Sequence, residues 1–299
     1  MIKRTLYFGS PAYLKTTNEQ LVVELQKEEA ESKSIPIEDI GLLILDHQQI
    51  TITQALLAKL LANNTAVICC DDTHHPTGMM LSLDGNSLQS QKFQAQVDAT
   101  VPLKKQLWQQ TVTAKIENQA AMMAFRREEN KTLLNLAASV KSGDTDNCEA
   151  QAAAYYWKRV FPDFLEFRRE RYGPPPNNLL NYGYAILRAL VARSLVASGL
   201  LPTLGIHHRN QYNAYCLADD IMEPYRPYVD FTVYQIIRNN GKYLDMSPSM
   251  KKALLEIPAM DVKIDGKKSP LMNAVQRTTA SLAKCFEGAT RKILYPEFS

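Results

Sequence analysis

The sequence has no apolar run long enough to cross a membrane. Its longest hydrophobic region, residues 179–201, is interrupted by Asn181, Arg188 and Arg193, whereas a membrane-spanning helix needs about 18 or more apolar residues. The N-terminal segment, residues 1–9, is too short and too mixed in character to act as a secretory signal. We therefore expect a cytoplasmic protein that makes no contact with a membrane.

Cysteine is scarce, and its spacing is irregular. The 299 residues include five cysteines, and no two of them form a C-x-x-C pair, which disfavours a zinc ribbon and a thioredoxin-type redox motif. An odd number of cysteines without framework spacing is typical of reduced thiols in a cytoplasm. A chain of this length buries enough surface to fold without disulfides, and its apolar fraction of 45% is that of an ordinary globular protein.

Charge is distributed unevenly along the chain, although the net charge is only +3. Residues 1–95 contain 7 Lys and Arg against 11 Asp and Glu, and residues 96–299 contain 27 against 20. The second part is therefore the better candidate for binding a polyanion such as a nucleic acid.

The first 70 residues are rich in predicted strands. β-Prone runs cover residues 2–8, 20–25, 50–52 and 65–70, and residues 35–40 and 41–45 predict a short strand followed directly by a more buried one. One helix is predicted at 53–62, with Thr53 as its N-cap. Short strands combined with a small helix predict a compact sheet domain of the β-sandwich type. Residues 71–94 show little periodicity and predict a linker or a hairpin, which places a domain boundary near residue 95.

Helical periodicity dominates the remainder of the chain. Apolar residues recur at a spacing of about 3.6 in segments 103–127, 131–140, 149–160, 178–198, 231–238, 248–256 and 271–286. Asn147 is a candidate N-cap for the third of these segments, and Gly199 is expected to end the fourth. The predicted fold class is α+β: a β-sandwich-like domain at 1–95, followed by an all-α domain at 96–299.

Polar groups that a structural role explains poorly occur in three stretches of the helical part. They are Glu149 in Cys148-Glu-Ala-Gln-Ala, the segment Gly205-Ile-His-His-Arg209, and the acidic segment Asp219-Asp-Ile-Met-Glu223, which precedes Pro224. By itself, a Glu in the first turn of a helix is explained by the helix dipole. Asp220 and Glu223 would share one face of a helix, and two close carboxylates repel each other unless a cation lies between them. Pro224 disfavours helical geometry at Glu223 and so predicts a helix start or a kink there.

Together these stretches form a set of carboxylates with one imidazole. Oxygen ligands combined with a histidine suit a hard or borderline divalent cation such as Mg²⁺ or Mn²⁺. Such an ion polarises a phosphoryl oxygen and activates a hydroxyl group. In a helical domain that binds polyanions, this combination indicates phosphodiester chemistry.

The same residues resemble the signature of Cas1, the CRISPR-associated endonuclease and integrase family of spacer acquisition. That signature is Gly-x-x-His, a spacer, and then Asp-Leu/Ile-x-Glu/Asp, and it is matched by Gly205-Ile-His-His and by Asp220-Ile-Met-Glu223. Further landmarks of the family match in order, namely Leu107-Trp108, Lys115-Ile-Glu-Asn-Gln119, Tyr155-Tyr-Trp157 and Asn181-Tyr-Gly-Tyr184. The resemblance covers essentially the whole chain and is closest to the branch found with type II systems.

The resemblance implies a site for Mg²⁺ or Mn²⁺ and assigns its ligands residue by residue. They fall on Glu149, His208 and Glu223, with Asp220 as an additional acidic residue of the catalytic site. Because the histidine stands three positions after Gly205, it is His208 and not His207. Asp219 is an extra carboxylate beside Asp220, which leaves open which of the two faces the metal.

The resemblance also implies a reaction and a set of partners. In the reaction, the 3′-hydroxyl of a foreign DNA fragment, the protospacer, attacks a phosphodiester at the leader–repeat end of a CRISPR array. The enzyme would thus be a metal-dependent DNA endonuclease and integrase of antiviral defence. The implied partners are double-stranded DNA, a second copy of the chain bound through the first domain, and the small protein Cas2, with which two homodimers form a heterohexamer. The effector nuclease Cas9 and a further adaptation protein are additional candidate partners.

Candidates for contact with DNA phosphates are Lys158, Arg159, Arg168, Arg169 and Arg226. Taken one at a time, each is explained more simply as a solvated surface charge or a structural ion pair. Two functions remain open: a metal-dependent DNA integrase, which the intact set of site residues favours, and a catalytically silent DNA-binding scaffold subunit of the same complex. A metallohydrolase of a small substrate lacks a pocket motif in the sequence, and it predicts no salt-dependent binding to DNA.

Overall fold

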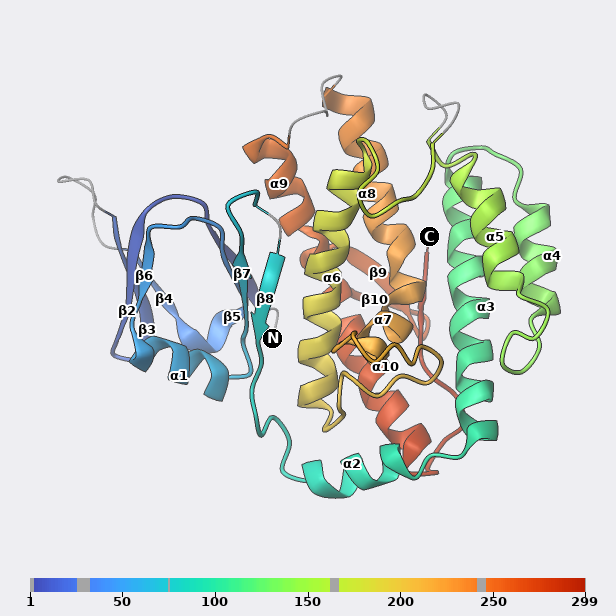
Figure 1. Ribbon diagram of the computed structural model, residues 1–299, viewed down its shortest axis with the longest axis horizontal. Helices are drawn as coiled ribbons and strands as arrows, with labels where there is room; N and C mark the ends of the chain where they lie inside the picture. Colours follow the sequence, from blue (N-terminus) through green and yellow to red (C-terminus); the bar gives the residue numbers. More distant parts are fainter. Residues whose placement is uncertain (1–2, 26–32, 75, 162–166, 241–245, 299) are drawn as a thin grey trace.

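The N-terminal part of the chain is built from two sheets that share a hydrophobic core (Figure 1). The computed structural model describes residues 3–25, 33–74, 76–161, 167–240 and 246–298. The strand order is β1-β5-β7-β8 in the first sheet and β4-β3-β2-β6 in the second. The first sheet contains β1 (Arg4–Phe8), β5 (Ile40–Leu45), β7 (Ala66–Cys70) and β8 (Pro76–Met80), and the second contains β2 (Ala12–Thr17), β3 (Gln20–Leu25), β4 (Lys33–Pro36) and β6 (Ile50–Ile52). The predicted β-sandwich-like domain is confirmed, although β2 was not predicted.

The first sheet is buried on both faces, because successive side chains of a strand point in opposite directions. Leu43 and Val67 pack toward the second sheet and toward helix α1 (Gln54–Ala62), whereas Leu42 and Ile44 join the core of the helical part. Burial on both faces explains why β5 is a continuous apolar run rather than an alternating one. Helix α1 begins as predicted, since the Thr53 side chain accepts a hydrogen bond from the Leu56 N–H at 3.4 Å.

Residues 71–94 are more structured than the predicted linker. Strand β8 pairs antiparallel with β7, which confirms the hairpin alternative. Helix α2 (Gln89–Val97) was not predicted, because its residues are mostly polar. Its buried residue Gln96 is held by hydrogen bonds from its amide to the carbonyl oxygens of Leu201 and Leu204, at 3.0 and 3.1 Å. The boundary expected near residue 95 falls within this helix.

The rest of the chain is mainly helical, as predicted. Its helices are α3 (Val101–Phe125), α4 (Lys131–Ser139), α5 (Cys148–Trp157), α6 (Asn177–Ala197), α7 (Cys216–Met222), α8 (Arg226–Asn240), α9 (Pro248–Leu255) and α10 (Leu271–Phe286). Short 3₁₀ turns are η1 (Ile37–Asp39), η2 (Glu223–Tyr225) and η3 (Ile257–Ala259). Helix α6 ends just before Gly199, which has a φ of +76° and so completes the predicted stop.

Helix α6 is the central element of the helical part. It lies beside β8 in Figure 1 and contacts α7, α8, α9 and α10 as well as β7 and β8. Most of its residues are buried, as expected for a helix that is surrounded on several sides. None of the helices in the described ranges combines the length and the apolar character needed to span a membrane.

The helical part also contains a small sheet that was not predicted. Strands β9 (Asp261–Ile264), β10 (Lys267–Pro270) and β11 (Pro296–Glu297) pair in the order β10-β9-β11. Asp265 and Gly266 join β9 to β10 with positive φ values of 52° and 71°, the conformation that Asp-Gly favours in a two-residue hairpin. Strand β11 lies beyond residue 286, in a part of the chain for which no strand was predicted.

Candidate functional site

Helix α3 carries a buried lysine among its core residues. Trp108, Val112, Lys115 and Ile116 lie at helical spacing, and all four are buried. A lysine is rarely buried unless it is paired, because its ammonium group loses its hydration. The position of Lys115 in this helix therefore requires partners of opposite charge in the interior.

The first turn of α5 brings Glu149 to Lys115. Asp144 caps this helix: its carboxylate accepts hydrogen bonds from the backbone N–H groups of Cys148 and Glu149, at 2.8 and 3.0 Å. Asn147 occupies the predicted N-cap position, but it adopts a φ of 55° and its side chain makes no capping hydrogen bond. The Glu149 carboxylate accepts a hydrogen bond of 2.6 Å from Lys115 Nζ.

Glu223 is placed by the single 3₁₀ turn η2 between α7 and α8. The predicted interruption is confirmed, but Glu223 itself keeps α-helical backbone angles, with a φ of −53° and a ψ of −47°. Pro224 has no N–H group to donate, so the regular α-helical hydrogen bonding is interrupted here. Asn118 of α3 donates a hydrogen bond of 2.7 Å to the Pro224 carbonyl oxygen and ties the turn to α3. The buried Glu223 carboxylate has its Oε2 2.6 Å from Lys115 Nζ, and its Oε1 accepts a hydrogen bond of 2.8 Å from Arg226 Nε.

Lys115 thus lies between the carboxylates of Glu149 and Glu223. Burial raises the pKa of Glu223, but the positive charges of Arg226 and Lys115 outweigh burial and bring this pKa down to about 2. Burial lowers the pKa of Lys115, and the charges of Glu223 and Glu149 more than compensate, so that the net shift is upward. Lys115 and Glu223 are therefore both charged at neutral pH.

The segment from Gly205 to His208 wraps around the fully buried carboxylate of Asp220. Asp220 Oδ2 accepts hydrogen bonds from the backbone N–H groups of Ile206 and His207 at 2.8 and 2.9 Å, and Oδ1 accepts one from that of His208 at 3.3 Å. A Cβ atom at position 205 would lie 2.4 Å from the His208 carbonyl oxygen and 2.8 Å from Asp220 Oδ2. Only glycine fits at this position, which explains the first residue of the Gly-x-x-His motif.

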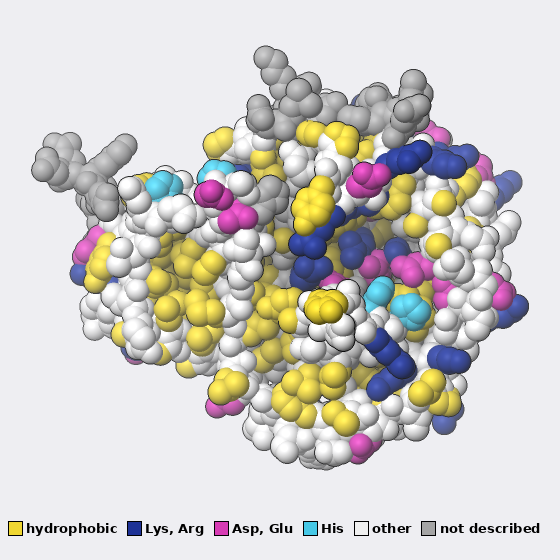
Figure 2. Space-filling model, in the orientation of Figure 1, with side chains coloured by type: hydrophobic (Ala, Val, Ile, Leu, Met, Phe, Trp, Pro, Cys, Tyr) yellow, Lys and Arg dark blue, Asp and Glu magenta, His cyan; other side chains and the backbone are white. Residues whose placement is uncertain are grey.

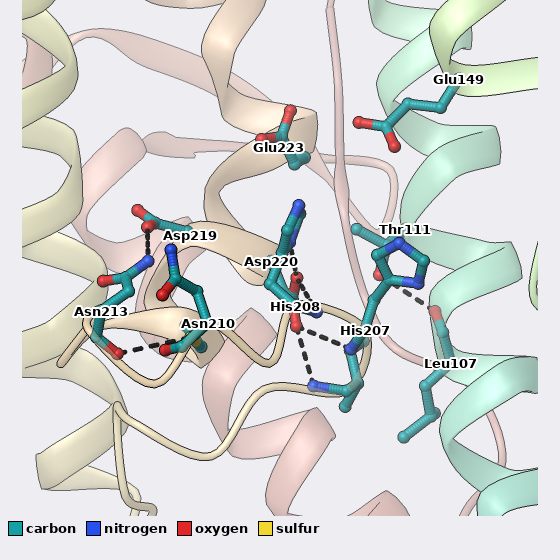
Figure 3. A network of polar contacts seen from close by, with 12 residues as sticks. Leu107, Thr111, Glu149, His207, His208, Asn210, Asn213, Asp219, Asp220 and Glu223 are labelled. Atoms are coloured by element: carbon teal, nitrogen blue, oxygen red, sulfur yellow. Dashed lines mark hydrogen bonds and ion pairs between the residues drawn. The ribbon is translucent and has the colours of Figure 1, made fainter.

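The two histidines of this segment face different neighbours (Figure 3). Nδ1 of His208 lies 2.5 Å from Asp220 Oδ1, and the ring points toward Glu223 and Glu149. The hydrogen bond to Asp220 raises the pKa of His208. His207 instead stacks on Trp108, with ring centroids 4.2 Å apart and planes 3° from parallel, and burial lowers its pKa. Asp220 therefore orients His208 and leaves its Nε2 available for a ligand.

Asp219 points away from the histidines toward the loop that precedes α7 (Figure 3). Its Oδ1 accepts a hydrogen bond of 2.6 Å from Arg188 Nε, and its Oδ2 accepts one of 2.7 Å from Asn213 Nδ2. Of the two neighbouring carboxylates, Asp220 is therefore the one directed at His208.

Glu149, Glu223 and His208 surround one hollow, where acidic, basic and histidine side chains gather (Figure 2). Within the described residues, no three His, Cys, Asp or Glu side chains lie close enough to hold a metal ion. The donors nevertheless fit one, because the two carboxylates already converge on a single cation, the Lys115 ammonium group, and His208 points toward them. Carboxylate oxygens with one imidazole are suitable ligands for Mg²⁺ or Mn²⁺.

The residues predicted to contact DNA divide into two kinds. Lys158, Arg159 and Arg168 are exposed. Arg169 and Arg226 are half-buried, and their guanidinium groups lie 5.2 and 4.6 Å from the centroid of the Tyr184 ring. Arg226 is also bonded to Glu223, and Arg169 donates hydrogen bonds to Asn177 and Asn181. Both half-buried arginines thus have structural contacts, and so does the exposed Arg159, whose guanidinium group lies 3.9 Å from the centroid of the Tyr155 ring.

Lys115 is a charged residue of the site that the sequence analysis named within a landmark of the family but to which it assigned no role. A signal was present, because Lys115 follows Val112 by three residues and Trp108 by seven, on the apolar face of the predicted helix. A lysine at such a position indicates a buried charge. Its partners could not be identified from the periodicity.

Comparisons with known proteins agree on one family. The family model described as CRISPR associated protein Cas1 matches residues 6–256. The CRISPR-associated endonuclease Cas1 of Neisseria meningitidis serogroup C (strain 8013) is 34% identical over 287 residues, which cover 94% of this chain and 91% of the relative.

Solved structures share the fold over nearly the whole chain. A casposase bound to integration product has a TM-score of 0.80 at 20% identity, covering 98% of this chain and 92% of the casposase chain. A chain of a Cas6-RT-Cas1–Cas2 complex has a TM-score of 0.75 at 22% identity, covering 97% of this chain and 35% of the other.

Proposed function

The chain belongs to the Cas1 family of CRISPR-associated proteins, and we propose that it is a metal-dependent DNA integrase that inserts short foreign DNA fragments into a CRISPR array. The observation that carries this proposal is the convergence of Glu149, Glu223 and His208 on one hollow, from three different segments of the helical part. Two descriptions support it: the relative from Neisseria meningitidis is an endonuclease, and the casposase is bound to an integration product.

In the proposed site, Glu149, His208 and Glu223 would hold the ion, Mg²⁺ or Mn²⁺. When bound, such an ion polarises a phosphoryl oxygen and stabilises the charge that develops during phosphoryl transfer. Asp220 keeps Nδ1 of His208 occupied, so that the imidazole offers Nε2. Arg226 fixes one oxygen of Glu223, which leaves the other to face the hollow.

The proposed reaction is a transesterification. The 3′-oxygen of the incoming fragment forms a bond to the phosphorus of a phosphodiester at the leader–repeat junction, and the bond from that phosphorus to its own 3′-oxygen breaks. The proton lost by the attacking hydroxyl balances the one gained by the leaving 3′-oxygen. One phosphodiester is broken for each one formed, so the step needs no energy-supplying nucleotide.

We propose double-stranded DNA, a second copy of the chain and Cas2 as partners. The excess of basic residues in 96–299 supports DNA binding by the helical part, and the exposed Lys158, Arg159 and Arg168 are the candidates for phosphate contact. The acidic balance of 1–95 favours assembly through the sheet domain. Cas2 is named in the description of a structural neighbour.

A strand-transfer assay tests the proposal. The purified protein, Cas2, a fragment with free 3′-hydroxyls and a plasmid carrying a leader and repeat should give covalently joined product in the presence of Mg²⁺ or Mn²⁺. Glu149→Gln should abolish joining, while Glu287→Gln, which removes an exposed carboxylate outside the hollow, should not. DNA binding without joining by the unaltered protein would instead identify a silent scaffold.

A further inference from the structure

Lys115 contacts two carboxylates, whereas an ordinary ion pair has only one. Its Nζ lies 2.6 Å from Glu149 Oε1 and 2.6 Å from Glu223 Oε2, so one ammonium group serves two carboxylates. The lysine side chain is 11% exposed, against 23% for Glu149 and 7% for Glu223. The ammonium group therefore lies between the more deeply buried Glu223 and the more open Glu149.

We infer that Lys115 is a resident cation of the metal site: its ammonium group holds Glu149 and Glu223 together while no divalent ion is bound, and it is displaced when an ion binds. This inference rests on the proposed function, because it assigns the two carboxylates to a metal. It makes Lys115 a positioning residue, which acts through its neighbours.

Displacement follows from the shared oxygen atoms. Mg²⁺ binds carboxylate oxygens at about 2.0–2.1 Å. An ion that used Glu149 Oε1 and Glu223 Oε2 would need the space that Nζ now occupies. Two cations that close to each other repel strongly, since the side chains of Lys115 and Glu223 are largely buried.

The balance of charge around Lys115 also favours its displacement by a divalent ion. Glu149 and Glu223 carry two negative charges, and Lys115 and Arg226 supply two positive ones. Adding a divalent ion would raise the net charge of these four groups from zero to +2, and withdrawal of one cation would halve that excess. Arg226 is held by Glu223 on one side and by the Tyr184 ring on the other, whereas a lysine has a flexible four-carbon stem. Lys115 is therefore the cation that moves.

The inference predicts the direction of a change in metal affinity. Lys115→Gln removes the charge and keeps a group that can donate a hydrogen bond to the carboxylates, and circular dichroism establishes that the variant is folded before the titration. Its affinity for Mn²⁺ should increase about tenfold, the ratio that corresponds to one charge-assisted hydrogen bond. Lys105→Gln, at an exposed lysine of the same helix, is the matched control and should leave the affinity unchanged.

The experiment is a Mn²⁺ titration followed by electron paramagnetic resonance, without DNA, on the unaltered protein and on Lys115→Gln, Lys105→Gln and Glu149→Ala. Tighter binding by Lys115→Gln alone supports the inference. If Glu149→Ala weakens binding but Lys115→Gln does not tighten it, the inference is overturned and the proposed metal site stands. If Glu149→Ala binds Mn²⁺ as well as the unaltered protein, the proposed site itself is wrong and the inference fails with it.

A second measurement needs no substitution in the protein that is titrated. Lysine labelled with ¹⁵N gives a resonance for the Lys115 ammonium group, assigned by its absence from the spectrum of Lys115→Gln. Saturation with Mg²⁺ should shift this resonance, because the ammonium group leaves its two carboxylates. A resonance that stays in place at saturating Mg²⁺ would overturn the inference.

Discussion

Two buried lysines of this protein have opposite surroundings. Lys251 of α9 shares a single carboxylate, that of Asp46, with other donors: Asp46 Oδ2 accepts hydrogen bonds from Lys251 Nζ at 2.8 Å and from the Tyr7 hydroxyl at 2.5 Å, and Oδ1 lies 2.9 Å from His74 Nδ1. Lys115 instead faces two carboxylates with one ammonium group. The first cluster has an excess of donors, and the second has an excess of acceptors.

The difference separates a carboxylate that is saturated with donors from two carboxylates that share one. Asp46 follows β5 and Lys251 lies in α9, so their ion pair joins the sheet domain to the helical part. Burial raises the pKa of Asp46, but the hydrogen bonds from Lys251, Tyr7 and His74 outweigh burial and lower it. A carboxylate with this many donors has no need of a further cation. The second cluster can accept one, because its oxygens outnumber its donors once Lys115 moves.

The largest expected effect concerns the two histidines beside the second cluster, that of Lys115, Glu149 and Glu223. His208→Ala should reduce metal-dependent strand transfer by orders of magnitude, since it removes the imidazole that Asp220 orients. His207→Ala should cost little, because that ring contributes a stacking contact with Trp108. Initial rates of joining with Mn²⁺ measure both. If His207→Ala were inactive and His208→Ala active, the ligand would have to be reassigned to His207.

The substitution Lys251→Met removes the ion pair of the first cluster, that between Lys251 and Asp46. Removing one partner of a buried ion pair leaves the other charge uncompensated, and the free energy of unfolding should fall by about 3–5 kcal/mol. Urea denaturation measures the change, with the exposed neighbour Lys252→Met as the control, which should change little. An unfolding free energy for Lys251→Met equal to that of the control would show that the ion pair does not hold the two parts together.

Acid should lower the stability that the second cluster contributes, because it protonates Glu223. Its pKa is about 2 in the folded protein against an ordinary 4.5, so the folded state binds fewer protons, and the stabilisation is present above pH 4.5 and lost as the pH falls toward 2. At 1.36 kcal/mol per pKa unit, the loss is about 3 kcal/mol.

The difference in unfolding free energy between the unaltered protein and Glu223→Gln, measured from about pH 5 to about pH 2, isolates this contribution. It should shrink as the pH falls. A difference that is constant with pH would contradict the assigned pKa.

The smallest expected effect comes from Asp144, which caps the helix that carries Glu149. Asp144→Ala leaves the N–H groups of Cys148 and Glu149 without their acceptor and should destabilise the protein by about 1 kcal/mol. Asp146→Ala removes a nearby exposed carboxylate that pairs with Lys141 and should cost less. Thermal unfolding of both variants measures the difference, and equal melting temperatures would argue against the cap.

Elements with a strong local pattern were predictable from the sequence. Helix α10 was predicted over residues 271–286 and occupies Leu271–Phe286, because its apolar positions recur regularly. The sequence Asp265-Gly266 was an available hairpin signal that the prediction did not use. Helix α2 could not be found in this way, since polar contacts such as those of Gln96 hold it in place.

The candidate site was predictable in its residues but not in its connections. Gly205, His208, Asp220 and Glu223 lie close enough in sequence for a motif to identify them, and Pro224 already indicated the turn at Glu223. That motif did not tell which carboxylate belongs to His208, because the answer depends on how the loop folds around Asp220.

The sequence by itself determined the family and the α+β fold class and supplied the candidate donor residues of the site, because these depend on local periodicity and on short motifs. Tertiary structure alone decided the partners of the buried charges. Lys115 meets Glu149 across 34 residues, and Asp46 meets Lys251 across 205. A buried charge is stabilised by whichever opposite charges the packing of helices and sheets brings within hydrogen-bonding distance, and local sequence does not encode that packing.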